Sequence, residues 1–209
     1  MPFPIYTNTT VLSAFTGSDE NPISEGGLWA SYSGWGGAMR RVSNELAGAT
    51  GSVYNASYIT STYANVEIVL DMPTFAAGSD YIEIQTRISA SPTLATWDGY
   101  KFTPDAGNAE IWRVTDGAQV TLVATGTVPA WANGDKIGIQ SIGTTLGMWR
   151  YTGGVWSLIT EGTNATYASA GHISVGCYSN LYRFDNLTIG TPAGVGGGGH
   201  TRLSLLGVG

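Results

Sequence analysis

The chain has 209 residues, a net charge of −6, only 11% charged residues and 30 glycines. This length suits one large domain, and low charge with abundant glycine favours strands and tight turns over helices. The acidic balance supplies no basic stripe for a phosphate backbone, so we expect no nucleic-acid partner.

The N-terminal stretch MPFPIYTNTT has no basic region and no long apolar run, so we expect no signal peptide. No later stretch is long and apolar enough to cross a bilayer, and we expect no membrane insertion. The single cysteine, Cys177, lies on the apolar phase of a predicted strand and is interpreted as a buried small hydrophobe.

Residues 1–10 are predicted to form an extended arm, because Pro2 and Pro4 restrict the backbone. Short apolar runs bounded by turn residues then predict the first strands of the domain. These expected strands are Val11–Phe15, Leu28–Tyr32, Met39–Val42 and Tyr54–Thr60.

Alternation is strongest in NVEIVLD (65–71) and DYIEIQTRIS (80–89). In the second segment isoleucines occupy one face, and polar side chains occupy the other. This pattern predicts a half-buried antiparallel strand with one face on the core and one toward water. The predicted outward residues are Tyr81, Glu83, Gln85 and Arg87.

Turn chemistry predicts several hairpins in the second half of the chain. Asp116-Gly117 and Gly153-Gly154 suit two-residue turns, and the segment 171–190 reads as a closing hairpin with a turn at Ser179-Asn180. A phase slip at Asp185-Asn186 predicts a β-bulge. The remaining expected strands are 100–102, 109–114, 119–124, 136–142, 146–151 and 155–159.

About a dozen short strands at regular spacing, without helical periodicity, predict an all-β antiparallel sandwich or jelly roll over residues 11–190. Residues 191–209 differ, because four consecutive glycines form a tether before an apolar end. We predict that this end docks on a partner chain, with disorder or packing against the sandwich as the alternatives. Its apolar residues are Leu203, Leu205, Leu206 and Val208.

The layout of residues 11–190 resembles the concanavalin A-like lectin and laminin-G-like jelly-roll superfamily. The FDN at 184–186, inside YRFDNLTIG, is the most characteristic piece. The apolar Leu-Gly-Val-Gly end is similar to the ends of small tailed-bacteriophage structural proteins. The superfamily resemblance further rests on Phe15 with the following DENP, Leu28-Trp29, NVEIVLD, DYIEIQTRIS, Gly99-Tyr100 and IWRV at 111–114.

Some relatives in this superfamily are retaining glucanases, which need carboxylates at alternate positions on one strand face. Here no predicted strand carries two acids at that spacing, and Glu67 and Asp71 lie four residues apart. The only histidines, His172 and His200, have no serine elbow to accompany them. We therefore predict that the protein is not an enzyme. The alternative is a glycoside hydrolase or lyase, which would require acids from different strands to lie close together.

No cofactor is required by this reading, but structural calcium is a candidate because carboxylate and amide oxygens suit it. Asp19 and Asn21 lie near the first predicted strand, and Asp185 and Asn186 lie on the last. The resemblance implies that these two strands run side by side, which would bring the four residues together. The alternative is turn capping, with Asp185 bonded to backbone.

Aromatic residues are the best positive signal for a ligand, with 7 Trp, 11 Tyr and 5 Phe. Flat rings stack on the apolar faces of sugars, and neighbouring polar side chains bind hydroxyls. The alternative is ordinary core and cross-strand packing. The predicted glycan-binding residues are Gln85, Arg87, Trp97, Asp98, Tyr100, Trp149, Arg150 and Tyr151.

Together these features predict a non-catalytic, lectin-like surface or structural protein. The resemblance of the tail implies a phage virion component, such as a capsid decoration, fibre or tail protein located at the virion surface. Its expected partners are a host-surface glycan, virion subunits and further copies of itself. The alternative is a carbohydrate-binding module outside any virion, as an extracellular or cytoplasmic protein.

Overall fold

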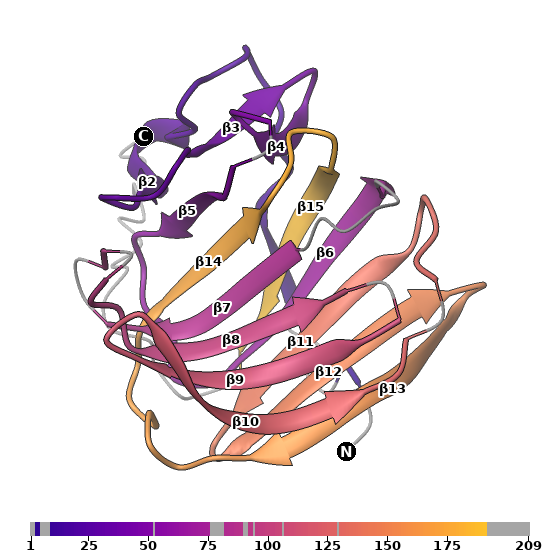
Figure 1. Ribbon diagram of the computed structural model, residues 1–209. Coiled ribbons are helices and arrows are strands. Elements are labelled where there is room, and N and C mark those ends of the chain that lie inside the picture. Colours follow the sequence, from indigo (N-terminus) through magenta and orange to yellow (C-terminus); the bar gives the residue numbers. More distant parts are fainter. Residues whose placement is uncertain are drawn as a thin grey trace, which may run out of the picture.

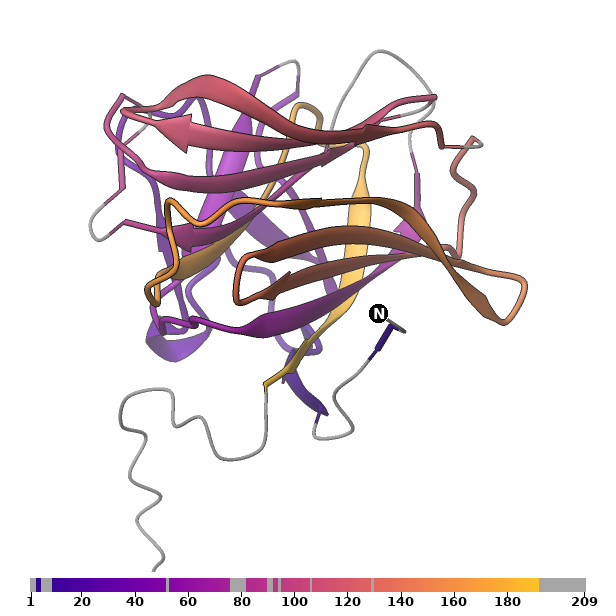
Figure 2. The same cartoon turned by 90° about the horizontal axis from the view of Figure 1, so that it is seen from below.

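The computed structural model describes residues 3–4, 9–51, 53–75, 82–89, 92–93, 95–105, 107–128 and 130–191. Within these ranges, fifteen strands form two antiparallel sheets packed face to face, and the helical structure is one short 3-10 turn, η1 (Glu25–Gly27). Figures 1 and 2 show the two layers from the front and from below. The predicted all-β antiparallel sandwich is therefore confirmed. Within the described ranges no helix has the length and hydropathy to cross a membrane.

The sheet nearer the viewer in Figure 1 is called the front sheet and has seven strands. Their spatial order is β10 (Ala118–Gly126), β9 (Ala109–Thr115), β8 (Gly99–Pro104), β7 (Ile82–Ile88), β14 (His172–Cys177), β5 (Asn55–Ile59) and β2 (Trp29–Ser31).

The other sheet, called the back sheet, has eight strands, and β1 (Thr9–Ser13) joins it by pairing with β15. The order of the remaining strands is β13 (Val155–Thr163), β12 (Thr145–Thr152), β11 (Lys136–Ile142), β6 (Val66–Thr74), β15 (Arg183–Gly190), β4 (Glu45–Gly48) and β3 (Met39–Val42).

Local turn chemistry positions several strands as expected. Asp116 and Gly117 both have positive φ, 50° and 71°, so β9 and β10 form a tight hairpin. The β-bulge at Asp185-Asn186 is confirmed by a register shift between Asp185 and Thr188 and by a φ of 47° at Asn186. The bulge changes the direction of side chains in the middle of the back sheet.

The predicted closing hairpin is wrong. β14 pairs with β5 and β7 in the front sheet, whereas β15 pairs with β6, β4 and β1 in the back sheet. The turn at Ser179-Asn180 therefore carries the chain from one layer to the other. Both strands keep an apolar face on the shared core, so their alternation alone cannot distinguish a hairpin from a crossover.

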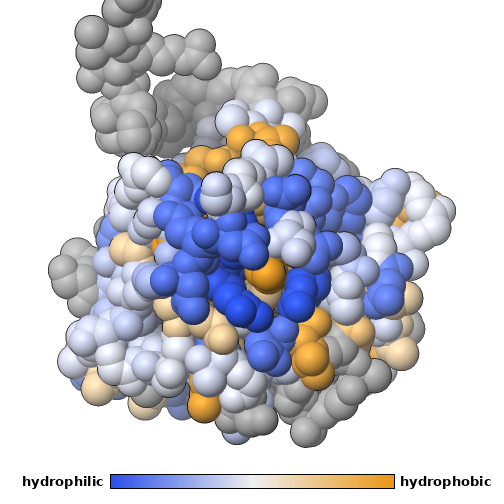
Figure 3. Space-filling view, turned by 90° about the horizontal axis from the view of Figure 1, so that it is seen from above, coloured by the Kyte–Doolittle hydropathy of each residue, from blue (hydrophilic) through white to orange (hydrophobic). Residues whose placement is uncertain are grey.

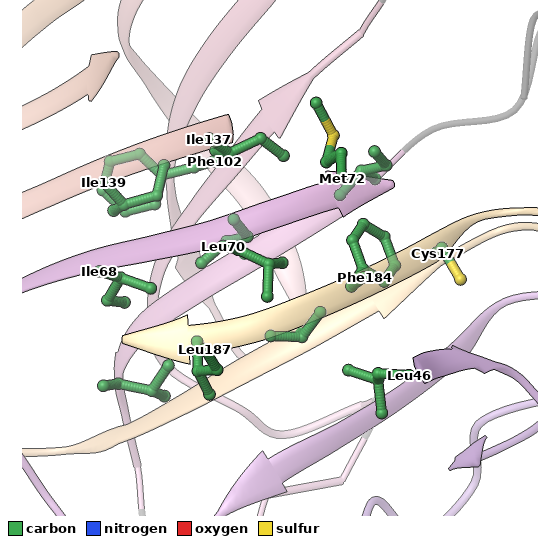
Figure 4. Packing of buried hydrophobic residues seen from close by; sticks show 14 of the residues in the cluster. Leu46, Ile68, Leu70, Met72, Phe102, Ile137, Ile139, Cys177, Phe184 and Leu187 are labelled. Carbon is green, nitrogen blue, oxygen red and sulfur yellow. The ribbon is translucent and has the colours of Figure 1, made fainter. Parts of the chain in front are cut away.

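The core lies between the two sheets, where apolar residues from both layers meet (Figure 4). Ile68 and Leu70 from β6 and Ile137 and Ile139 from β11 face Phe102 of the front sheet. Because these positions alternate with outward ones, the side chains that can reach a ligand lie on the two outer faces.

The prediction that β7 is half-buried is also wrong, because every residue from Ile82 to Ile88 is buried. The outer face of the front sheet is covered by a second apolar cluster, separate from the core between the sheets. The candidate site lies on this covered outer face of the front sheet.

Candidate functional site

An aromatic wall stands on the outer face of the front sheet and consists of Tyr32, Trp35, Tyr54 and Tyr58. The rings of Tyr32 and Trp35 stack with centroids 4.5 Å apart, and Trp35 lies 4.1 Å from Tyr54. Tyr32 meets Tyr58 edge to face at 5.3 Å. Offset and edge contacts of this kind hold aromatic rings in defined orientations.

The loop between β2 and β3 folds Trp35 over the sheet. Gly34 has a φ of 83°, which a residue with a side chain rarely adopts, so glycine permits the reversal there. The amide of Gly37 then donates to the carbonyl of Tyr54 at 3.0 Å and ties the loop to β5. The loop therefore places the indole ring of Trp35 over the sheet.

A pocket of about 440 Å³ lies between this wall and strands β8 to β10. Its apolar side includes Trp97 and Val114, and its polar side includes Glu83 and Lys101. The indole Nε1 of Trp35 is buried and has no hydrogen-bond acceptor. The complete lining is Trp35, Tyr54, Glu83, Trp97, Lys101, Val114, Gly117 and Gln119.

Glu83 is the centre of a buried polar network at the base of the pocket. Its carboxylate is only 3% exposed, forms an ion pair with Lys101 and accepts hydrogen bonds from Tyr54 and Gln85. The Gln85 oxygen in turn accepts from Tyr32 Oη at 2.7 Å. Burial raises the pKa of Glu83, while the charge of Lys101 acts in the opposite direction. The network fixes several polar groups before any ligand arrives.

Two further acids lie beside Lys101 on the same face. Glu110 accepts from Trp112 Nε1 at 2.7 Å and from Asn108 at 2.9 Å. Burial, reinforced by the charge of Glu110, raises the pKa of Asp105 from its ordinary 3.8 to about 6. Carboxylates from β7, β9 and the end of β8 thus gather on one surface, although no single strand carries a pair.

This cluster predicts a pH dependence of stability. The folded protein holds the Asp105 proton more tightly than the unfolded chain, so Asp105 makes stability fall as pH rises from about 4 to about 6. We expect Asp105→Asn to weaken that decline and to raise the melting temperature at pH 7.5 relative to the unmodified chain. Thermal unfolding at pH 4.5 and 7.5 measures both effects. An unchanged pH profile would contradict the assignment.

The residues predicted to bind glycan do not form one patch. Trp97 lines the pocket and Gln85 belongs to its network. Asp98 and Arg87 instead line a smaller cavity of about 270 Å³, where Arg87 donates to the backbone carbonyls of Ala64 and Tyr167. Tyr100 is fully buried in the core, which places its ring out of reach of a surface ligand.

The other predicted trio lies on the back sheet, and its members alternate between faces. The Trp149 ring packs on Phe3 at 5.4 Å on the outer face. Arg150 is buried and pairs with Asp135 at 2.6 Å. Tyr151 again faces outward, beside Trp156. Consecutive residues of a strand point to opposite faces, so a run of three cannot build one surface.

Sequence reasoning missed most of the pocket. The sequence analysis gave no binding role to Trp35 or Tyr54, and Lys101 and Gln119 belong to no motif. The one local signal was the glycine-flanked Trp35, since glycines beside an aromatic ring allow a tight flap.

The four predicted calcium ligands contact different partners. β1 and β15 lie side by side as expected, but Asp19 accepts from the Ser43 amide at 2.9 Å at the end of the sandwich formed by β3 and β4. Figure 3 views that end, where hydrophilic residues predominate. Asp185 accepts from the backbone and side-chain nitrogens of Asn186, which also donates to Asp71. Asn21 directly follows Glu20, which bridges to Arg41 of β3.

Among the described residues no group of three His, Cys, Asp or Glu side chains could hold a metal ion. The first turn folds onto the β3–β4 hairpin instead of toward the bulge, so the donor set expected from the sequence is not assembled there. The predicted docking tail, Leu203, Leu205, Leu206 and Val208, lies outside the described residues.

No protein-family model matches the chain, and no curated protein matches it. Solved structures do. The carbohydrate binding module CBM66 from Bacillus subtilis superposes with a TM-score of 0.61 at 12% identity, covering 78% of this chain and 96% of that one. The VIP36 exoplasmic/lumenal domain in its Ca²⁺/Man-bound form gives 0.64 at 9% identity, covering 88% and 91%.

A prokaryotic β-1,3-1,4-glucanase (lichenase) derived from a mouse hindgut metagenome is also similar, with a TM-score of 0.57 at 9% identity, covering 84% of this chain and 98% of that one. At these identities the likeness concerns the fold. The chain has the jelly-roll fold of the concanavalin A-like lectins and carbohydrate-binding modules, as the sequence resemblance implied.

Proposed function

We propose that this chain is a non-catalytic carbohydrate-binding protein and that its ligand enters the pocket on the front sheet. The observation that carries the proposal is the aromatic wall beside the buried network of Glu83, Lys101 and Gln85. A sugar ring has apolar C–H faces that pack on aromatic rings and hydroxyls that bond to fixed polar groups.

The network lowers the cost of binding because its groups are ordered in advance. Glu83 and Gln85 are held by Tyr54, Tyr32 and each other, so a ligand does not have to immobilise them. These fixed polar groups favour a hydroxyl-rich ligand.

The structural neighbours support the same ligand class. Proteins of similar fold include a carbohydrate binding module, a lumenal domain in a Ca²⁺/Man-bound form and a β-1,3-1,4-glucanase. We therefore choose mannose oligosaccharides and mixed-linkage β-glucan oligosaccharides as probes. We also propose that the natural ligand is a host-surface glycan, as the sequence predicts.

Trp35→Ala is expected to weaken sugar binding at least about tenfold, equivalent to about 1.4 kcal/mol, because it removes the indole ring from the pocket wall. Isothermal titration of each variant with the two probes measures the loss. Tyr178→Ala, on an exposed ring outside the pocket lining, is the matched control and should bind normally. Equal affinity of the Trp35 variant and the control would contradict the proposal.

The surroundings of Glu83 and Glu110 favour sugar binding without hydrolysis. Glu83 is buried and engaged by Lys101, Tyr54 and Gln85, and Glu110 accepts from two donors, so both carboxylates are held as hydrogen-bond acceptors. The glycoside hydrolase alternative predicts release of reducing ends from mixed-linkage β-glucan. We expect none, and the same samples used for titration provide the assay.

We do not assign calcium to the pocket, because the Lys101 ammonium already provides the positive charge beside Glu83. The titration is therefore designed with calcium and with chelator, and equal affinities are expected. The sequence also predicts assembly with further copies or with virion subunits, and a location at the virion surface. These predictions depend on the C-terminal tail and are not tested by the structure.

A further inference from the structure

We propose a second sugar-binding site on the outer face of the back sheet, on the side of the sandwich opposite the first. It is a separate pocket of about 460 Å³. The inference goes beyond the proposed function, because it rests on different residues and would hold if the front pocket bound nothing.

The site is built on one row of side chains that crosses five neighbouring strands. Trp156 of β13 pairs in register with Tyr151 of β12, Tyr151 with Lys136 of β11, and Lys136 with Asp71 of β6. Asp71 in turn faces the bulge of β15, where Asn186 is placed. Side chains in register on neighbouring strands share a face, so the row forms a continuous surface with aromatic and polar ends.

The aromatic end has a defined shape. Tyr151 and Trp156 lie 5.2 Å apart with their planes tilted by 53°. Phe3 of the N-terminal arm packs edge to face against Trp156 with ring centroids 4.7 Å apart. Gly138 makes room for this contact, since a Cβ there would lie 2.5 Å from the Phe3 ring. The platform is therefore held in place before a ligand binds.

The polar end offers both donors and acceptors. Lys136 Nζ lies 2.8 Å and 2.9 Å from the two Asp71 oxygens, and the Asn186 amide approaches Asp71 at 3.3 Å. The β-bulge places Asn186 in the pocket lining, because the positive φ of Asn186 changes the direction of its side chain. Adjacent pairs of hydroxyls on a sugar ring match such an array of carboxylate, ammonium and amide.

The charges at the site discriminate between ligand classes. A cationic ligand would need the face of Tyr151, but the Lys136 ammonium already lies 6.0 Å from its centroid. An anion such as phosphate would meet two carboxylates, because Asp71 and Asp185 both accept from the Asn186 amide and Lys136 balances only one of them. A neutral, hydroxyl-rich ring with an apolar face fits both ends of the row. Two such sites on opposite faces would let one chain bridge two glycans.

The experiment uses the full chain with Trp35→Ala to disable the front pocket and Tyr151→Leu to disable the back pocket. Tyr151→Leu keeps an apolar side chain but removes the ring and the hydroxyl. Val155→Ala is the matched control, because Val155 lies in the same hairpin, is 65% exposed and does not line the pocket. Each protein is screened on a printed array of mannose and mixed-linkage β-glucan oligosaccharides, and bound sugar per chain is then measured by titration.

We expect two sugars per chain in the unmodified protein and in Val155→Ala, and one in each single-site variant, with the residual site unaltered in affinity. Beads coated with a bound glycan should be cross-linked by the unmodified chain and not by Tyr151→Leu. Asp71→Asn, which spares the rings, should lower affinity at the back site at least about tenfold and leave the front site unchanged.

The inference is overturned if Trp35→Ala abolishes all binding, or if Tyr151→Leu changes neither stoichiometry nor affinity. Binding that persists in Trp35→Ala but disappears in Tyr151→Leu, with one sugar in the unmodified chain, supports the back site and rejects the front one. The two proposals can therefore fail separately.

Discussion

Glu83→Ala is expected to lower the free energy of unfolding by about 3–5 kcal/mol, because it breaks a buried ion pair by removing one partner. Lys101 is only 13% exposed and would lose the carboxylate that compensates its desolvation. The Tyr54 hydroxyl and the Gln85 amide would lose an acceptor as well. Urea unfolding at pH 7, with the slope compared between variants, measures the change.

Two further variants separate charge from packing in this network. Glu83→Gln keeps an acceptor for Tyr54 and Gln85, so it should cost less than the alanine variant. The double variant Glu83→Leu with Lys101→Met removes both charges and should recover much of the loss, since an apolar pair of similar size can replace a buried ion pair. A loss below about 1 kcal/mol for Glu83→Ala would show that the network does not support the fold.

Phe184→Ala is expected to cost about 3–5 kcal/mol, since it empties a fully buried ring position between the sheets. Phe184 lies among Leu46, Met72 and Leu187 in the core (Figure 4). Phe184 is also the first residue of the FDN motif that supported the fold prediction. The role of this residue in the motif is therefore to fill the core. Equilibrium unfolding in urea again gives the magnitude.

Phe184→Leu should cost less, because leucine fills part of the same space. Leu181→Ala is the surface control, since Leu181 lies two residues before β15 and is 60% exposed. Its effect should stay within about 0.5 kcal/mol. Equal destabilisation by Phe184→Ala and Leu181→Ala would contradict the packing shown by the structure.

The sandwich gives one chain two outer faces with different chemistry. The front face holds an aromatic wall over a buried ion pair, and the back face holds an aromatic pair beside Asp71 and Lys136. Both pockets combine rings with fixed polar groups, which is the composition expected of sites for neutral hydroxyl-rich ligands. The closed fold separates them by the full thickness of the core.

Much of the fold was predictable from local pattern. The segment KIGIQSI was expected as a strand and is β11, and Met39–Val42 was expected with the bounds it has. The Asp116-Gly117 hairpin followed from residues that tolerate positive φ. β4 was missed, because Glu-Leu-Ala-Gly has no β-branched residue and becomes a strand only through pairing with β3 and β15.

The site was less predictable, because its parts come from different strands. Glu83, Lys101 and Trp35 are brought together by pairing between β7 and β8 and by the folded-back loop after β2. The predicted trio Trp149, Arg150 and Tyr151 was divided between two faces by the same alternation that identified its strand. Of the predicted glycan-binding residues, Trp97 and Gln85 lie at the front pocket and Tyr151 lies at the back pocket. The others lie at neither pocket.

By itself the sequence determined the class of fold, most strands, the tight turns and the bulge at Asp185-Asn186, because each depends on neighbouring residues and a period of two. Only the tertiary structure decided that β14 and β15 lie in different sheets, that β7 is covered on both faces, and which acids meet on one surface. Those outcomes depend on which strands pair across long stretches of chain, and alternation within a strand carries no information about its partner.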